Sequence, residues 1–156
     1  MSKPHHFSAC CCVALILFTA LPSLAGDQRP DFQMALLSHT GGHWNPRPRG
    51  LSRLAWEVRK RTSVSIALEP AAIDPGTEKL FDHPFLVWAG DQSFPPLSEV
   101  AIANLRQHLK MGGTLLVDLS DGQINGPFDR AVKRELRRVL PEETLKRVPP
   151  DHVIYK

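Results

Sequence analysis

Residues 84–118 read PFLVWAGDQSFPPLSEVAIANLRQHLKMGGTLLVD and determine the fold class of this chain. The apolar runs at 84–89 and 114–118 lack polar alternation, which is typical of strands buried on both faces of a parallel sheet. Between them, Ser98 is a favourable N-cap for a helix and Gly112-Gly113 is a favourable C-terminal stop. The intervening apolar residues repeat at helical spacing: Ile102, Leu105 and Leu109. The stretch therefore predicts two parallel strands joined by a helix.

The rest of the chain continues this alternation. Towards the N-terminus we expect a strand at 32–38, a loop at 40–50, a helix at 51–61, a strand at 63–68 and an irregular segment at 70–82. Towards the C-terminus we expect a loop at 120–126, a helix from Pro127 that stops at Pro141, and a short last strand at 145–148. This order predicts a single α/β domain with a mostly parallel sheet and helices on both faces.

The N-terminus has the pattern of a secretory signal peptide. A short polar start containing Lys3 precedes an uncharged apolar run at 7–21, and small residues stand before a cut after Ala25. The run is shorter than the roughly 20 residues of a membrane-spanning helix. We therefore expect residues 1–25 to be removed, residues 26–156 to form the domain, and the product to be periplasmic or secreted. An uncleaved N-terminal anchor is the alternative.

Removal of residues 1–25 would also remove all three cysteines, which are residues 10–12. The exported domain would then have no thiol for a disulfide, a zinc site or a nucleophile. Its net charge would fall from +3 to +2 with the loss of Lys3, and mixed charges of that size argue against nucleic acid as a partner. We expect no cofactor, and no membrane contact after cleavage.

Candidate ligand-binding residues follow from the rule that open α/β sheets bind ligands beyond the carboxyl ends of their strands. The loops after the predicted strands, the third helix and the C-terminal segment contribute Gly41, Gly42, His43, Trp44, Asp91, Asp118, Asp121, Asp129 and His152. The glycine pair could let backbone N–H groups approach an anion, and Trp44 could stack on a sugar or cover the core. Asp121 could simply form a turn, and Asp129 could serve the helix dipole.

A metal site is the weaker interpretation of these loops. His39 and His43 are four residues apart, but the glycines between them remove the helix that would align two ligands. With Asp91 and Asp118 they form the candidate metal set. The basic residues of the third helix (130, 133, 134, 137 and 138) fit a solvated helix face.

Several stretches together resemble a bacterial exported family called domain of unknown function 4159. They are TGGHWNPRPRGLSRLAWEVRKRTSV, HPFLVWAG, LKMGGTLLVD, GPFDRAVKREL and PPDHVIY, in that order. The resemblance implies a three-layer, flavodoxin-like sandwich similar to class I glutamine-amidotransferase-like domains. The chain departs from the family pattern at 90–92 and at 118–120, where family members tend towards a Gly-His-Gly-like turn and a cysteine. It also ends soon after residues 151–155, where family members tend to continue.

Two functions follow as expectations. The first is a non-catalytic binding module of the bacterial envelope, with a small molecule or an envelope protein as its partner. The second is a metal-assisted hydrolase of an envelope saccharide or amide, with His39, His43, Asp91 and Asp118 around the metal. Whether the chain is an enzyme stays open at this point.

Overall fold

The computed structural model describes residue 30 and residues 32–156 of the chain. Its strands are β1 (Ala35–Leu37), β2 (Ala71–Ile73), β3 (Phe85–Gly90) and β4 (Thr114–Leu119). Its α-helices are α1 (Gly50–Arg61), α2 (Glu99–Lys110) and α3 (Pro127–Val139), and two short 3₁₀ helices are η1 (Glu78–Asp82) and η2 (Val153–Tyr155). Within this part of the chain, no helix is long and apolar enough to cross a bilayer. The predicted signal peptide lies outside the described residues.

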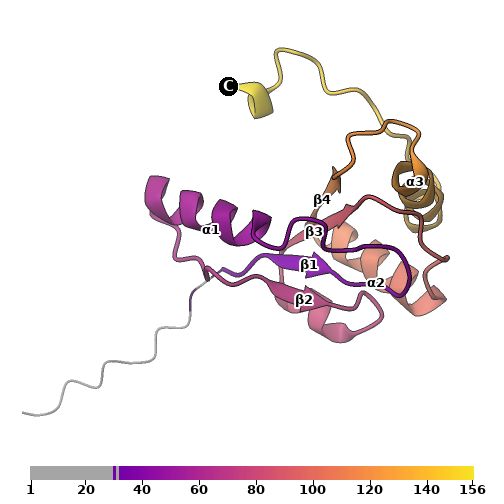
Figure 1. The fold of residues 1–156 in the computed structure, drawn as a ribbon, viewed down its shortest axis with the longest axis horizontal. Helices are drawn as coiled ribbons and strands as arrows, with labels where there is room; N and C mark the ends of the chain where they lie inside the picture. The colour runs from indigo at the N-terminus through magenta and orange to yellow at the C-terminus, as the bar shows by residue number, and fades with distance from the viewer. Residues whose placement is uncertain (1–29, 31) are drawn as a thin grey trace, which may run out of the picture.

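The four strands form one all-parallel sheet in the order β2-β1-β3-β4 (Figure 1). The longest pairing joins β3 and β4, where six consecutive residues pair from Phe85↔Thr114 to Gly90↔Leu119. These are the two apolar runs of the sequence, so the strand–helix–strand prediction is confirmed. The expected burial on both faces holds for β3 but not for β4, which has no buried residue because one side of it is only thinly covered. The α/β fold class with a parallel sheet is confirmed as well.

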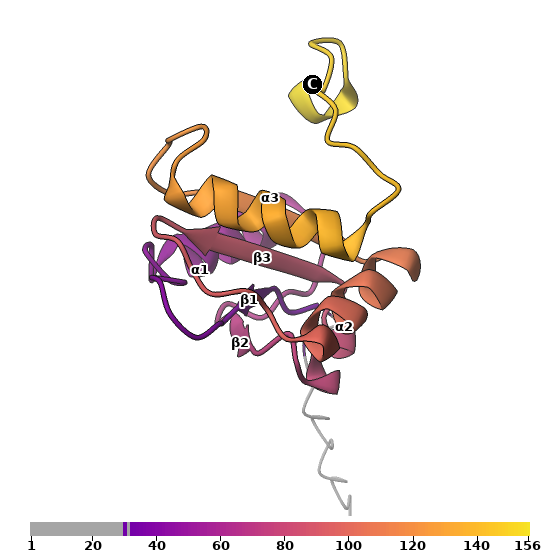
Figure 2. The ribbon, with the colours of Figure 1, turned by 90° about the vertical axis from the view of Figure 1, so that its right-hand side faces the viewer.

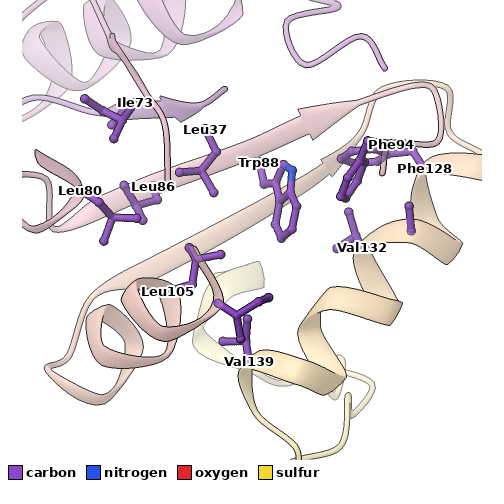
Figure 3. Packing of buried hydrophobic residues seen from close by; sticks show 13 residues of the cluster. Leu37, Ile73, Leu80, Leu86, Trp88, Phe94, Leu105, Phe128, Val132 and Val139 are labelled. Carbon is purple, nitrogen blue, oxygen red and sulfur yellow. The ribbon is translucent and has the colours of Figure 1, made fainter. Parts of the chain in front are cut away.

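The helices cover the two faces of the sheet unequally. On one face, α2 and α3 pack over β1 and β3 in a large cluster that includes Trp88, Leu105 and Phe128 (Figures 2 and 3). On the other face, α1 contributes Ala55 to a smaller cluster. Over β3 and β4 this second face is only partly covered, and the side chain of Leu116 remains 45% exposed.

The prediction of a strand at 63–68 is wrong. Only Ile66 of this stretch forms a β-bridge, an isolated one to Phe32 outside the four strands, and the edge strand forms instead at Ala71–Ile73, within the segment expected to be irregular. Pairing with β1 begins only after Pro70, where the N–H of Ala71 donates to the carbonyl oxygen of Met34 at 3.0 Å. An alternating pattern does not indicate where a strand finds a partner.

The last strand predicted at 145–148 does not form either. Leu145 and Val148 are exposed, and the segment after α3 leaves the body of the domain (Figures 1 and 2). No strand of the described residues lies beside it to supply ladder hydrogen bonds, and an isolated strand has little stability in water. The strand expected at 32–38 is real but shorter, at 35–37.

Candidate functional site

The strand order places a switch point between β1 and β3. The chain leaves β1 towards β2 on one side, and β3 continues the sheet on the other side. The loops that follow these two strands, at 38–49 and 91–98, therefore start from neighbouring carboxyl ends. Crevices at such points are the usual ligand sites of open α/β sheets, so this edge is where we assemble the candidate site.

At this edge His43 and Asp91 form a pair. Both were selected as candidate ligand-binding residues because they follow predicted strands. His43 Nδ1 donates to Asp91 Oδ2 at 3.1 Å, and the imidazole is 51% exposed. The other carboxylate oxygen, Oδ1, is buried and has no partner among the described residues. The carboxylate thus fixes the ring orientation and leaves Nε2 pointing away from it.

The glycine pair before His43 has a conformational role. Gly41 and Gly42 have φ of +72° and +68°, which side-chain-bearing residues rarely adopt. A Cβ on Gly42 would also lie 3.0 Å from the carbonyl oxygen of Ser93. The two glycines therefore turn the loop tightly enough to bring it against the loop after β3.

His39 does not join this pair. Its ring packs against Phe94, with the ring centroids 4.4 Å apart, and lies edge-on to Trp88. Its Nδ1 must donate to the carbonyl of Gly41, 3.0 Å away, because a carbonyl only accepts. Burial lowers the pKa of His39 below its ordinary value. Burial thus favours the neutral form of this histidine, which is part of the packing beneath the loop.

Asp118 is engaged by Arg47, a residue that the sequence analysis did not select. Arg47 Nη1 donates to Asp118 Oδ2 at 3.3 Å, and Nη2 donates to Ser120 O at 3.1 Å. The Ser120 hydroxyl also donates to Asp118 Oδ2, at 2.9 Å. Arg47 lies 71 residues before Asp118 in an arginine- and proline-containing loop, so no local spacing indicated the contact.

Beside this ion pair lies a cleft of about 270 Å³, which we call the switch-point cleft. Its floor is the thinly covered face of the sheet, and its walls are α1 and the loop before it. The apolar lining is Leu36, Val87, Ala89, Leu116, Val117, Leu51, Leu54, Pro48 and Pro70, with Gly50, and its polar members are Asn45, Arg47 and Asp118. Leu54 of α1 is 40% exposed and faces this cleft.

Trp44, Asp121 and Asp129 lie near these loops but have local partners. Trp44 packs on the apolar cluster of the sheet face beneath α1. Asp121 Oδ1 accepts from Gln123 N in a turn. The carboxylate of Asp129 accepts from Lys133 Nζ and from a loop N–H, each at 2.7 Å, and the pair with Lys133 lowers the pKa of Asp129. The carboxylates therefore stabilise the turn and the start of α3.

His152 lies away from the strand ends. It is exposed in the C-terminal segment, where its ring accepts from Ile154 N at 3.2 Å. Figure 1 shows this terminus apart from the sheet. The metal candidates likewise do not gather in one place: His39 faces the core, and Asp118 faces Arg47. Across the described residues, no group of three His, Cys, Asp or Glu side chains could hold a metal ion.

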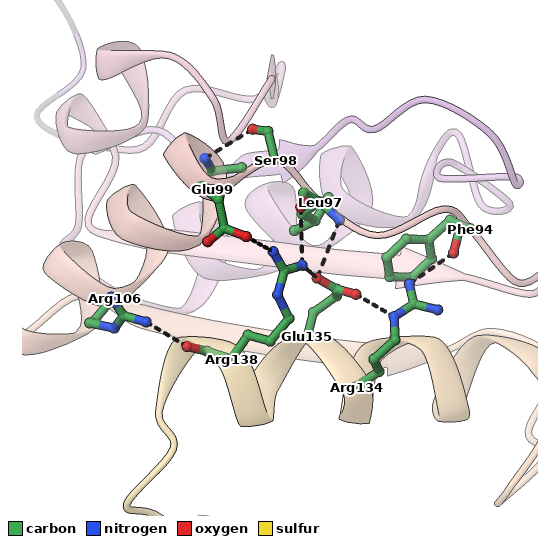
Figure 4. A network of polar contacts seen from close by, with 9 residues as sticks. Phe94, Leu97, Ser98, Glu99, Arg106, Arg134, Glu135 and Arg138 are labelled. Carbon is green, nitrogen blue, oxygen red and sulfur yellow. Dashed lines mark hydrogen bonds and ion pairs between the residues drawn. The ribbon is translucent and has the colours of Figure 1, made fainter.

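The loop after β3 is held by a buried carboxylate that the sequence analysis missed. Glu135 on α3 is fully buried, and it accepts from Leu97 N and pairs with Arg134 and Arg138 (Figure 4). Arg134 Nη2 in turn donates to Phe94 O at 3.0 Å. The expectation that these two arginines lie on a solvated face is thus wrong, because they join α3 to the loop that carries Asp91.

Comparison with known proteins places the chain in a family. A family model described as Domain of unknown function (DUF4159) matches residues 33–156, which is most of the chain. The chain therefore belongs to this family. No curated protein matches it.

Proposed function

We propose that this member of the DUF4159 family is an exported binding domain that holds a small, largely apolar ligand in the switch-point cleft. The observation that carries the proposal is the cleft itself, an apolar-lined space of about 270 Å³ beside the Arg47–Asp118 ion pair. Ligand sites commonly combine apolar walls with a few polar groups that orient the ligand. The polar end of the cleft, at Arg47 and Asp118, lies near the carboxyl end of β4, on the edge of the sheet where such folds bind ligands.

The ion pair indicates what the polar end of the ligand must offer. A guanidinium has five N–H donors, and the two contacts described above use two of those on Arg47. Among the described residues, no hydrogen bond reaches Asp118 Oδ1. A neutral group with a donor and an acceptor side by side, such as an amide, could satisfy both partners without adding a charge to a balanced pair.

The test uses N-phenyl-1-naphthylamine, a neutral dye that fluoresces in apolar sites. We expect saturable binding of one dye per chain. Ala89→Leu places a larger side chain on the cleft floor and should weaken binding about tenfold or more, because each methylene excluded from apolar contact loses about 0.8 kcal/mol. Ala103→Leu, at an exposed position on α2, is the matched control. Unsaturable binding, or equal affinities in wild type and Ala89→Leu, would refute the proposal.

Export rests on the sequence pattern and is tested separately. After expression in a bacterial host with a periplasm, intact-mass measurement of the exported protein should give a chain that begins at Gly26. A chain retaining Met1 in the membrane fraction would instead identify the apolar run at 7–21 as an anchor.

The pair of His43 and Asp91 supports a second candidate, hydrolysis of an envelope saccharide or amide. A histidine oriented through Nδ1 by a carboxylate can use Nε2 as a general base towards water. Incubation with purified cell-wall sacculi should then release soluble fragments. His43→Ala should abolish the release, whereas His152→Ala, in the C-terminal segment, should not. Absence of release by the wild-type protein would eliminate this candidate for that substrate.

A further inference from the structure

A dense group of exposed basic residues lies on α1 and at its N-cap. Residues 49–61 contain five basic residues and one acidic residue, a net charge of +4, whereas the whole chain has a net charge of +3. All five are exposed: Arg49, Arg53, Arg59, Lys60 and Arg61. Figure 1 shows α1 at the periphery of the domain, with one side on the sheet and the other facing outward. We call this outward side the α1 basic face.

The needs of the helix explain only part of this charge. Arg59, Lys60 and Arg61 lie in the last turn, where cations favourably meet the negative end of the helix dipole. Arg49 occupies the N-cap without a side-chain cap bond, and the first turn has no acidic residue. Cations at that end oppose the dipole. Arg53 pairs with Glu57 one turn along the helix, at 3.0 Å. Helix stability therefore accounts for Arg53 but not for Arg49.

An exposed aromatic ring lies among these cations. Trp56 is 40% exposed, with Arg53 Cζ 4.6 Å and Lys60 Nζ 4.8 Å from the ring centre. Just beyond the helix, the side chain of Val64 is 45% exposed. Tryptophan is enriched at membrane–water interfaces, and clusters of exposed Lys and Arg residues are attracted to the negative surface of anionic bilayers.

We propose that the α1 basic face docks on the surface of a bilayer that contains anionic phospholipid. The cations supply the attraction, and Trp56 and Val64 rest at the level of the headgroups. The inner side of α1, with Ala55, stays packed on the sheet, so the helix does not insert. Nucleic acid fits less well, because two cations already lie over the ring that would stack on a base. This proposal replaces the expectation that the domain has no membrane contact after cleavage.

The experiment measures co-flotation of the exported protein with phosphatidylcholine vesicles, with and without 30% phosphatidylglycerol, in 0.1 M salt. We expect at least about tenfold stronger partitioning onto the anionic vesicles, since each basic residue near such a surface contributes about fivefold. High salt should remove the difference by screening. A retained apolar N-terminus would bind both vesicle types, so the ratio between them is the quantity that reports on α1.

Variants separate the α1 basic face from overall charge. Arg59→Glu with Lys60→Glu should reduce the ratio to about one, and Trp56→Ala should lower it a few-fold. Lys146→Glu with Arg147→Glu makes the same change of charge at an exposed basic pair in the C-terminal segment, and should leave most of the preference. Equal binding to both vesicles, equal losses in the two double variants, or tighter binding to duplex DNA than to anionic vesicles would each overturn the proposal.

Discussion

Replacing Glu135 by alanine should lower the free energy of unfolding by about 3 kcal/mol. The side chain is fully buried and its carboxylate is shared by Arg134, Arg138 and the N–H of Leu97 (Figure 4). Removing one partner of a buried ion pair costs about 3–5 kcal/mol, because the remaining charges lose their compensation. The side chains of the two arginines are 38% and 30% exposed, so water partly hydrates their charges and the lower end of that range applies.

The assay is urea unfolding at neutral pH, followed by tryptophan fluorescence, since Trp88 lies in the core that α3 covers. Glu135→Gln keeps the shape and one acceptor for Leu97 N, so its loss should be smaller, about 1–2 kcal/mol. Glu142→Ala, at an exposed position after α3, should change stability by no more than about 0.5 kcal/mol. A loss below about 1 kcal/mol for Glu135→Ala, with an unchanged dependence on urea, would refute the reasoning.

Three further predictions concern the core, a helix cap and pH. Burial lowers the pKa of His39 and His108 below the ordinary 6.5, so the unfolded chain binds more protons than the folded one below that pH. Stability should therefore be complete above pH 6.5 and fall below it, which urea midpoints measured from pH 8 to 5 would show. If the double variant His108→Gln with His39→Gln has the same pH dependence of stability as the wild type, this prediction is wrong. Gly90→Ala would place a Cβ 2.3 Å from the buried ring of Phe128, and the overpacking should cost about 3 kcal/mol in the same assay; a neutral result would mean that the ring moves freely. Ser98→Ala removes the side-chain cap of α2 and should cost about 1 kcal/mol, with Ser98→Asp restoring most of it.

The fold was predictable where apolar pattern and burial coincide. The stretch from 84 to 118 became β3, α2 and β4, but only β3 has the burial that its continuous apolar run predicts; no residue of β4 is buried, and Leu116 is 45% exposed. The expectation failed at 63–68 and at 145–148, where a strand needs a neighbour that local sequence does not specify. In the first case the pairing with β1 moved to Ala71–Ile73, and in the second case no partner strand lies beside the segment.

The candidate site was predictable in part. The rule about strand ends selected His43 and Asp91, which the structure brings to 3.1 Å, and Asp118, which forms the ion pair beside the cleft. It could not select Arg47 or Glu135, because their partners lie far along the chain or on another element. A basic residue in a loop has the same appearance in sequence whether it is solvated or bound.

By itself, the sequence determined the parallel α/β class, the three helices and the family, since each depends on residue types and their spacing along the chain. Only the tertiary structure decided which histidine faces Asp91 and which faces the core, that Arg47 closes on Asp118, and that the sheet face over β3 and β4 is left open as a cleft. The physical reason is that side-chain contacts between elements depend on register and on how far each helix covers the sheet. Hydrophobic periodicity indicates which face of an element is buried, but not which part of its neighbour lies against that face.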